Sequence, residues 1–384
     1  MSVSMRSLDG DAWPALLPVL AQSFNAPEPG WGLFRARVGE DRFRVAHEGD
    51  RVVGGYAVYA LGQRWWGRDV PLGGVAGVGV VPDARGRGVA KAMMLDALRW
   101  MRESGVPVVG LYPASWQVYR SVGYEAAGER VQFEVPAAAL SAYRAEVVVT
   151  PIDPVDPAGR AALRARYQPV HGNLIRSEAI WARLTHPYVG RRYAWLLGDH
   201  GYVVLGHTPP EGPHWDLDVV DLAAPDAPTA RTLLGLLGGH RSMVRQVRWW
   251  GTPADTLVTH LREPVANVAR QERWMLRVVD LPAALEARGW PPGVSGELHV
   301  HVEDELIPEQ AGPWVVHLVA GRARVLRGGR GELRLTARAM GPLYSGYLSA
   351  SALAAAELLA GPPEVLAVAD RWFAAPTPWM REMY

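Results

Sequence analysis

The chain has 384 residues, 49% of them hydrophobic and 21% charged, with 40 lysines and arginines against 39 aspartates and glutamates. This length exceeds what one typical hydrophobic core covers, so we expect two or three domains. The near-neutral charge excludes a protein that attracts nucleic acid through a global cationic field, and the absence of cysteine excludes disulfides, thiolate metal sites and a cysteine nucleophile.

The sequence has no pattern typical of a membrane span or a secretory signal. No stretch approaches the roughly 20 uncharged apolar residues that a membrane-spanning helix needs. The opening MSVSMRSLDGDAW also lacks the apolar core of about 7–15 residues that a secretory signal contains. We therefore expect a cytoplasmic protein with no membrane partner.

Residues 1–145 alternate helical and strand-like patterns, which indicates an α/β domain. Helices are expected at 13–24 and 89–103, and strands at 42–61, 73–81 and 106–113, the first of them divided in two by a Glu-Gly-Asp turn. In the second helix the apolar residues form one face opposite Lys91, Arg99 and Arg102. We expect this face to pack on the sheet.

A turn rich in glycine and arginine, Arg85-Gly86-Arg87-Gly88, precedes the second helix. A helix N-terminus has about four unpaired N–H groups and a partial positive charge, so it binds anions where side chains leave room. The glycines leave this room and permit positive φ, while the arginines add charge. The turn predicts a pyrophosphate site; the alternative is a surface turn without a ligand.

This turn lacks the G-x-x-x-x-G-K-[ST] pattern and the G-x-G-x-x-G pattern with a following acidic residue, so nucleotide hydrolysis and dinucleotide binding fit poorly. It resembles the acetyl-CoA signature [RQ]-x-x-G-x-[GA] of the GNAT acetyltransferases, here running from Arg85 to Ala90. The resemblance implies acetyl-CoA as co-substrate. Its pantetheine arm would lie on the backbone of Val78 and Val80, and its pyrophosphate on the amides of the turn from Arg85 to Gly88.

The stretch SWQVYRSVGYE at 115–125 resembles the F-Y-x-x-x-G-F element of the same family. In that family the first tyrosine protonates the departing thiolate, and Tyr119 occupies this position, with Tyr124 as the packing aromatic after Gly123. A phenol with a pKa near 10 is neutral at pH 7 and can donate this proton. The alternative is that Tyr119 is only a core aromatic.

A second domain is predicted after the segment TPIDPVDPAG at 150–159, which we interpret as a linker because each proline disfavours helix and removes a backbone donor. Helices at 157–167 and 229–240 and strands at 193–207 and 215–222 repeat the α/β plan. Nothing in this region matches the Arg-Gly-x-Gly turn. We therefore expect a catalytically silent copy.

The pattern changes again near residue 272. Strands are expected at 273–281, 296–304, 314–321, 322–328 and 331–340, followed by apolar helices at 347–359 and 363–373. This order is typical of an α+β domain with a mostly antiparallel sheet. The predicted domains are therefore 1–147, 148–271 and 272–384.

This three-part plan resembles the enhanced intracellular survival (Eis) family of N-acetyltransferases: tandem GNAT-like domains followed by a domain similar to sterol carrier proteins. The resemblance implies that the α-carboxylate of Tyr384 is buried in the first domain's active site as general base. Burial raises the pKa of a carboxylate, which makes it a better acceptor for the proton of an ammonium substrate. The alternative is that the terminus frays in water, which the apolar side chains of Trp379, Met380 and Met383 oppose.

The same resemblance implies amine acceptors, such as aminoglycosides, polyamines or lysine side chains, attracted by acidic residues. Glu28 and Glu382 are the candidate contacts. Many relatives carry a Ser-Glu pair just before the catalytic tyrosine, where this chain has Ala114 and Ser115, so the choice of acceptor stays open. Because relatives form hexamers, we expect a homo-oligomer.

Two further patterns are interpreted as structural. His299, His301 and Glu303 alternate along one strand and could bind a metal, but no further ligand clusters with them, so we expect a solvated strand face and no metal. Six arginines between 322 and 338 nearly alternate with apolar residues. They fit the solvated side of an amphipathic sheet better than a nucleic-acid patch.

Two functions compete with an amine acetyltransferase. One is a lipid or acyl-CoA carrier whose third domain binds the ligand and whose first domain is vestigial. The other is a protein N-terminal acetyltransferase, which shares the first domain but needs a peptide groove.

Overall fold

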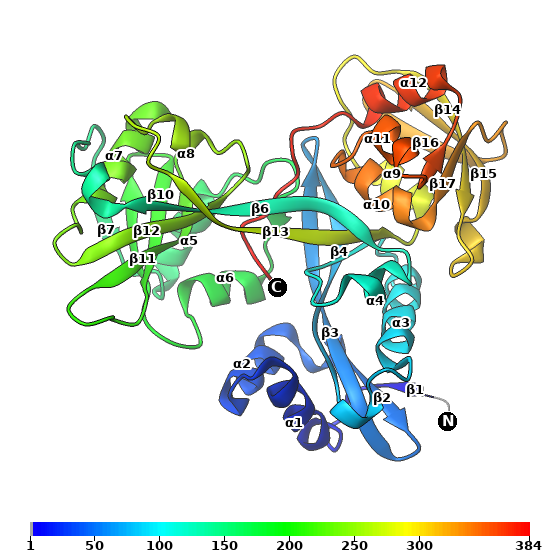
Figure 1. Ribbon diagram of the computed structural model, residues 1–384, viewed down its shortest axis with the longest axis horizontal. Coiled ribbons are helices and arrows are strands. Elements are labelled where there is room, and N and C mark those ends of the chain that lie inside the picture. Colours follow the sequence, from blue (N-terminus) through cyan, green and yellow to red (C-terminus); the bar gives the residue numbers. More distant parts are fainter. Residues whose placement is uncertain (1–2) are drawn as a thin grey trace.

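The computed structural model describes residues 3–384 and contains a 13-stranded sheet and a 5-stranded sheet. Figure 1 shows three lobes: the N-terminal region at the lower right, the middle region on the left and the C-terminal region at the upper right. Within the described residues, no helix is both long and apolar enough to cross a membrane.

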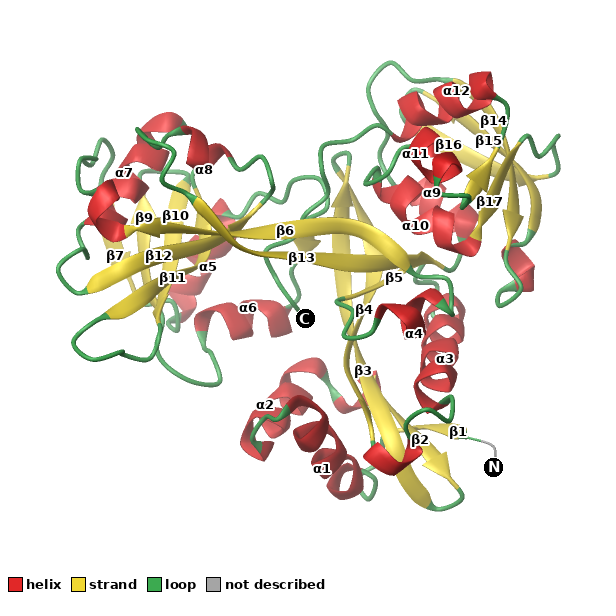
Figure 2. Cartoon of the chain, in the orientation of Figure 1, coloured by secondary structure: helices red, strands yellow, loops and turns green. Residues whose placement is uncertain are grey.

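The N-terminal lobe is an α/β unit with helices on both faces of its strands (Figure 2). Its elements are β1 (Ser4–Ser7), α1 (Trp13–Phe24), α2 (Glu28–Val38), β2 (Phe43–Glu48), β3 (Arg51–Trp65), β4 (Arg68–Val80), α3 (Val89–Glu103), β5 (Val108–Leu111), α4 (Trp116–Arg120) and β6 (Glu125–Pro136). Leu16 and Leu20 of α1 belong to the core on one face, and Met93 and Ala97 of α3 to the core on the other. The predicted helices at 13–24 and 89–103 are confirmed.

The middle lobe repeats this plan. Its elements are β7 (Val149–Ile152), α5 (Pro157–Arg166), β8 (Leu174–Ile175), α6 (Glu178–Thr185), β9 (Tyr193–Leu197), β10 (Gly201–His207), β11 (Trp215–Ala223), α7 (Ala227–Gly238), β12 (Val244–Gly251), α8 (Thr256–Thr259) and β13 (Asn267–Val278). The predicted hairpin, strand and helices of this region are all present. The interpretation of 150–159 as a linker is wrong at its start, because β7 pairs with β9 at the end of the sheet, and an edge strand tolerates Pro151.

The long strands β6 and β13 join the two lobes into one sheet, with the order β1-β2-β3-β4-β5-β13-β6-β12-β11-β10-β9-β7. Both cross from one lobe to the other in Figure 1. β13 pairs with β5 and with β6, so its C-terminal half completes the sheet of the N-terminal lobe. The prediction that the strand at 273–281 belongs to the third domain is therefore wrong, and the predicted boundary at 271/272 falls inside β13.

The C-terminal lobe is an α+β unit around the 5-stranded sheet β16-β15-β14-β17-β18, in which only the β14–β17 pair is parallel. Its elements are α9 (Leu281–Ala287), β14 (Gly296–Glu303), β15 (Gly312–Val319), β16 (Arg322–Arg327), β17 (Leu333–Thr336), α10 (Ala337–Ser345), α11 (Ala350–Ala355), β18 (Leu359–Ala360) and α12 (Pro363–Phe373). The predicted strand at 331–340 is wrong beyond Thr336, whose side chain accepts from the amide of Ala339 and begins α10.

Candidate active site

The strand β4 has a free edge where the predicted pantetheine site lies. Its parallel pairing with β5 covers only Leu72–Gly74, while β3 pairs with its other edge as far as Val80. Between these points the register with β3 shifts, so that Gly77 and Val78 lie opposite one β3 residue, and Gly77 has φ +61°. This β-bulge bends the strand and turns its unpaired amides and carbonyls toward a cavity.

The predicted pyrophosphate turn lies beyond the end of β4, at the N-terminus of α3. Gly86 and Gly88 have φ values of +74° and +83°, and a Cβ built on either would meet no atom within 4 Å. Glycine is therefore required by the backbone conformation, and open space remains in front of the helix. The first amides of α3 lack intrahelical partners because of their position, which leaves them available to an anion.

The two arginines of this turn already have partners. The Nε of Arg85 donates to the carbonyl of Val80 at 3.1 Å, and Arg87 forms an ion pair with Glu48 at 2.7 Å. These contacts fix the path of the turn and partly compensate the charge of Arg87. Both side chains are exposed, and their remaining N–H groups take no part in these two contacts.

A cavity of about 600 Å³ lies between the bulge of β4, the segment after β5 and the end of the chain. It is lined by Phe24, Val75–Val78, Tyr112–Ala114, Trp116, Tyr119, Gln271–Arg273, Met383 and Tyr384. The fold therefore brings together Val78, Tyr119 and Tyr384 from three distant parts of the predicted site. Val80 and the turn at 85–90 lie outside this lining, further along the path from β4 to α3.

Tyr119 lies on α4 and is 6% exposed. Burial raises the pKa of its phenol above the ordinary value, and its ring packs edge-on against Tyr124 with centroids 6.1 Å apart. A phenol in this state is neutral at pH 7 and able to donate a proton into the cavity.

Tyr384 occupies the point where β4 and β5 diverge. A Cβ on Gly74 would lie 2.8 Å from its ring, and a Cβ on Gly110 would lie 2.7 Å from its hydroxyl. Tyr59 and Tyr112 contact the ring edge-on, with centroid distances of 6.2 and 6.0 Å. Burial also raises the pKa of the Tyr384 phenol well above its ordinary value. The side chain is therefore a neutral anchor that holds the residue at the cavity.

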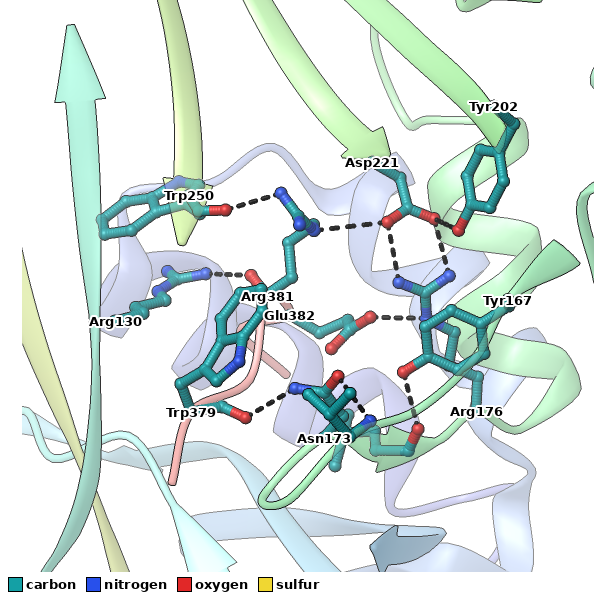
Figure 3. Close-up of polar contacts among 12 residues, drawn as sticks. Arg130, Tyr167, Asn173, Arg176, Tyr202, Asp221, Trp250, Trp379, Arg381 and Glu382 are labelled. Atoms are coloured by element: carbon teal, nitrogen blue, oxygen red, sulfur yellow. Dashed lines mark hydrogen bonds and ion pairs between the residues drawn. The ribbon is translucent and has the colours of Figure 1, made fainter. Parts of the chain in front are cut away.

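The residues before Tyr384 are held by a buried network of charges from the middle lobe (Figure 3). Arg176 donates from Nε to Glu382 at 2.5 Å and from its two terminal nitrogens to Asp221 at 2.6 and 2.9 Å. Tyr202 donates to the same Asp221 carboxylate at 2.7 Å. The side chains of Arg176, Asp221 and Glu382 are at most 2% exposed, so water hardly weakens these pairs.

Backbone groups of the same segment are bound as well. The carbonyl of Trp379 accepts from Asn173 at 2.8 Å, and the carbonyl of Arg381 accepts from Arg130 at 2.5 Å. The Arg381 side chain donates to the carbonyl of Trp250 at 2.5 Å and pairs with Asp221 at 3.3 Å. We call Arg176, Asp221 and the 379–382 segment that they hold the tail clamp.

These contacts locate the two predicted acceptor residues. The Glu382 side chain faces Arg176 and is absent from the lining of the 600 Å³ cavity. Glu28 is exposed in the first turn of α2 and is also absent from that lining. This placement favours an anchoring role for Glu382, and it brings neither carboxylate to the cavity.

Sequence reasoning missed the residues that β13 contributes. Glu272 lines the cavity and pairs with Arg130 at 2.6 Å, and its neighbours Gln271 and Arg273 line the cavity too. No local pattern identifies them, because their place depends on pairing with β5 and β6. The bulge at Gly77 had a usable signal, since an isolated glycine inside a strand pattern often marks a bulge.

The interior of the C-terminal lobe is nearly filled. Its apolar cavity measures about 20 Å³ and is enclosed by α9, α10 and the sheet. On β14, His299 is 9% exposed rather than solvated, and its ring accepts from the Arg330 amide at 3.2 Å. Among residues 3–384 no group of three or more histidine, cysteine or acidic residues could hold a metal ion.

Comparison with known families accounts for each lobe. Residues 4–127 and 172–278 each match an acetyltransferase (GNAT) domain, and residues 281–381 match a sterol carrier protein domain. These matches confirm the predicted fold class of tandem GNAT-like domains followed by a sterol-carrier-protein-like domain.

Full-length relatives share the same architecture. The chain is 30% identical to a GCN5-related N-acetyltransferase from Anabaena variabilis, with a TM-score of 0.95 and coverage of 100% of both chains. A GCN5-related N-acetyltransferase from Kribbella flavida is also 30% identical, with a TM-score of 0.87 over 100% of this chain and 98% of that one. N-acetyltransferase Eis of Mycobacterium tuberculosis is 28% identical over 94% of this chain and 93% of its own length. The chain therefore belongs to the GCN5-related N-acetyltransferases, as an acyltransferase with two acetyltransferase domains and a sterol carrier domain that is similar to Eis.

Proposed function

We propose that this enzyme transfers an acetyl group directly from acetyl-CoA to a primary amine, with Tyr119 as general acid and the α-carboxylate of Tyr384 as general base. The observation that carries this proposal is the 600 Å³ cavity, in which the free edge of β4, Tyr119 and Tyr384 meet. A proton donor, a place for a carboxylate and a strand edge for a pantetheine amide are the parts that the reaction needs.

The residues present fit acetyl-CoA. The unpaired edge of β4 around Val78 and Val80 offers backbone donors and acceptors to the pantetheine arm. The turn from Arg85 to Gly88 and the first amides of α3, up to Ala90, offer N–H groups to the pyrophosphate. Positive φ at Gly86 and Gly88, with empty space at both Cβ positions, lets the backbone approach the phosphates closely.

The chemistry follows from these positions. The carboxylate removes a proton from the acceptor ammonium and passes it to water, and the free amine attacks the thioester carbonyl. The new C–N bond forms as the C–S bond breaks, and the thiolate of CoA receives the Tyr119 proton. The second proton of the attacking nitrogen passes to the carboxylate, and solvent returns a proton to the Tyr119 phenolate. Direct transfer needs no covalent enzyme intermediate, which agrees with a chain that has no cysteine.

The acceptor is proposed at the level of a primary amine. Because Glu272 at the cavity already pairs with Arg130 at 2.6 Å, the α-carboxylate of Tyr384 is the group that attracts a cationic amine. Aminoglycosides, polyamines and lysine side chains are the acceptor classes that resemblance to Eis enzymes suggests. Assembly as a homo-oligomer, with a hexamer as the first expectation, belongs to the same proposal and can be measured by light scattering.

Three variants test the catalytic roles through CoA thiol release. Tyr119→Phe should lower kcat by roughly a hundredfold, because it removes the proton donor. Deleting Tyr384 should lower kcat similarly, and adding one glycine after Tyr384 should do the same, because the anchored ring then stays while the carboxylate moves. Calorimetry with CoA should show unchanged binding for all three. Full turnover in the deletion and extension variants would contradict the terminal base while leaving acetyl transfer intact.

Of the two competing functions, the lipid carrier fits less well and the peptide acetyltransferase is decided by experiment. A cavity of about 20 Å³ in the C-terminal lobe holds no acyl chain, which opposes a lipid carrier. A protein N-terminal acetyltransferase predicts that short peptides outcompete small amines as acceptors. A panel of peptides and small amines, compared by kcat/KM, decides this point.

A further inference from the structure

A second cavity, of about 470 Å³, lies beside the active-site cavity on the side of the middle lobe. Met383 lines both cavities, so the two spaces meet at this side chain next to Tyr384. An acceptor whose amine lies at Tyr384 has this second cavity within its reach. The residues that line the second cavity therefore influence which amines the enzyme accepts.

The charged residues of this cavity are mostly arginines. Five arginines and two carboxylates line it: Arg130, Arg183, Arg192, Arg248 and Arg381, with Asp218 and Glu382. We call this space the arginine cavity.

Three of the arginines are neutralised by neighbouring carboxylates. Arg130 pairs with Glu272 at 2.6 Å. Arg248 pairs with Glu134 at 2.5 Å and with Asp216 at 2.7 Å, and Arg381 pairs with Asp221 at 3.3 Å. These three arginines line the cavity but add little net charge to it.

Arg183 and Arg192 are different. Within residues 3–384, neither has a carboxylate oxygen within 4 Å of its guanidinium. The Nε of Arg192 is buried and has no hydrogen-bond partner in the described part of the chain. Burial lowers the pKa of Arg192, and the charge of Asp218 only partly opposes this. Arg192 is partly buried, and leaving its buried Nε without a hydrogen-bond partner is costly. An oxyanion would relieve that cost.

The two carboxylates that line the arginine cavity do not neutralise both Arg183 and Arg192. The Glu382 side chain faces away, toward Arg176. Asp218 forms no ion pair within 4 Å in the described structure, and its single negative charge can offset only one of the two arginines. The free charge of the arginine cavity is therefore positive.

Arg183 also lies at the side of the active site. Burial raises the pKa of Tyr59 and of Tyr112, and the charge of Arg183 opposes the rise in both cases. These are the two tyrosines that contact the Tyr384 ring. Arg183, which has no carboxylate partner among the described residues, thus lies next to the residues that contact Tyr384.

We propose that the arginine cavity binds an oxyanion carried by the acceptor, a carboxylate or a phosphate, through Arg183 and Arg192. The proposal rests on the proposed acetyl transfer and specifies its substrate class: amines that carry a negatively charged group beyond the reacting nitrogen. Planar guanidinium groups match the two oxygens of such anions. The amine end faces the α-carboxylate of Tyr384 and the anionic end faces the arginines, so a dipolar acceptor is complementary to both cavities, whereas a polycation is complementary only to the first.

The test compares matched acceptors with the full-length enzyme. Unbranched ω-amino carboxylates of increasing length are measured against the corresponding ω-amino amides and against spermidine, by CoA thiol release. In wild type we expect the carboxylate of the best length to exceed its amide by roughly tenfold in kcat/KM, the size typical of a charge-assisted hydrogen bond. Arg183→Gln and Arg192→Gln should remove this preference while turnover of the amides is retained, which shows that the variants fold.

Arg191→Gln is the matched control, because Arg191 is exposed next to Arg192 and does not line the cavity. It should keep the wild-type preference. If amides or spermidine are acetylated as well as the carboxylates, or if the preference survives in the double variant Arg183→Gln with Arg192→Gln, this inference is overturned and acetyl transfer stands. If no amine releases thiol from acetyl-CoA, the proposed function fails and the inference fails with it.

Discussion

At the scale of single residues, the active site depends on positions where a side chain is absent. Gly74 and Gly110 leave the space that the Tyr384 ring fills, and a Cβ on either would lie within 2.8 Å of ring or hydroxyl atoms. The glycines of the turn at 85–88 serve the backbone conformation instead, since space is open there. Glycine thus makes room for the end of the chain at one place and leaves open space at the predicted cofactor turn.

Gly110→Ala should lower kcat by roughly tenfold to a hundredfold, because the added methyl group displaces the Tyr384 hydroxyl and misplaces its carboxylate. The Kd for CoA should not change, since β5 lies outside the turn at 85–90. The decisive measurement is a double-mutant cycle: in a chain without Tyr384, Gly110→Ala should have no further effect on kcat. A full additional loss in that background would show that the methyl group acts elsewhere.

At the scale of elements, the middle lobe has no match to the Arg-Gly-x-Gly turn, but it has a structural role in holding the end of the chain. Its strands and loops supply Arg176, Asp221 and Asn173, which hold the segment at 379–382. Arg176 also stacks on Tyr167 at 3.7 Å, so the clamp is rigid as well as charged. A buried clamp fixes the residues just before Tyr384, as the proposed catalysis by its carboxylate requires.

Glu382→Gln separates an anchoring role from a role in acceptor binding. If Glu382 anchors the tail, kcat should fall about tenfold, the KM for the acceptor should hardly change, and carboxypeptidase should release Tyr384 faster than from wild type. If Glu382 contacts the acceptor, its KM should rise instead and the proteolysis rate should stay constant. Glu364→Gln, exposed on α12, is the control and should change neither quantity.

At the scale of the whole molecule, the sequence predicts features that depend on neighbouring residues, but not those that depend on pairing between distant strands. The ends of α1 and α3, and the glycine-arginine turn between β4 and α3, follow from neighbouring residues. The place of β13 between β5 and β6 does not, because strand pairing across most of the chain has no local signature. Glu272 and the contacts of the tail clamp were missed for this reason, and Tyr384 was predicted mainly through family resemblance.

The three lobes also meet at one titratable residue, His171. Its Nδ1 accepts from the Trp66 amide of the N-terminal lobe at 3.3 Å, and its Nε2 contacts the Ser345 carbonyl of the C-terminal lobe at 2.9 Å. Burial lowers the pKa of His171 from 6.5 to about 4. The neutral ring fits both contacts, because only a neutral imidazole can accept at one nitrogen and donate at the other.

This pKa difference makes the junction of the lobes sensitive to acid. Above pH 6.5 the ring is neutral in both the folded and the unfolded chain, so its contribution to stability is intact. As the pH falls from 6.5 toward 4, the unfolded chain binds a proton that the folded chain does not, and the free energy of unfolding falls by about 3 kcal/mol.

Denaturant unfolding at pH 7, 5.5 and 4.5 should show this loss in wild type and in a His200→Gln control. His171→Gln should start less stable at pH 7 but lose less on acidification, because glutamine can also accept and donate without titrating. An equal loss in His171→Gln and wild type would assign the acid sensitivity to other groups.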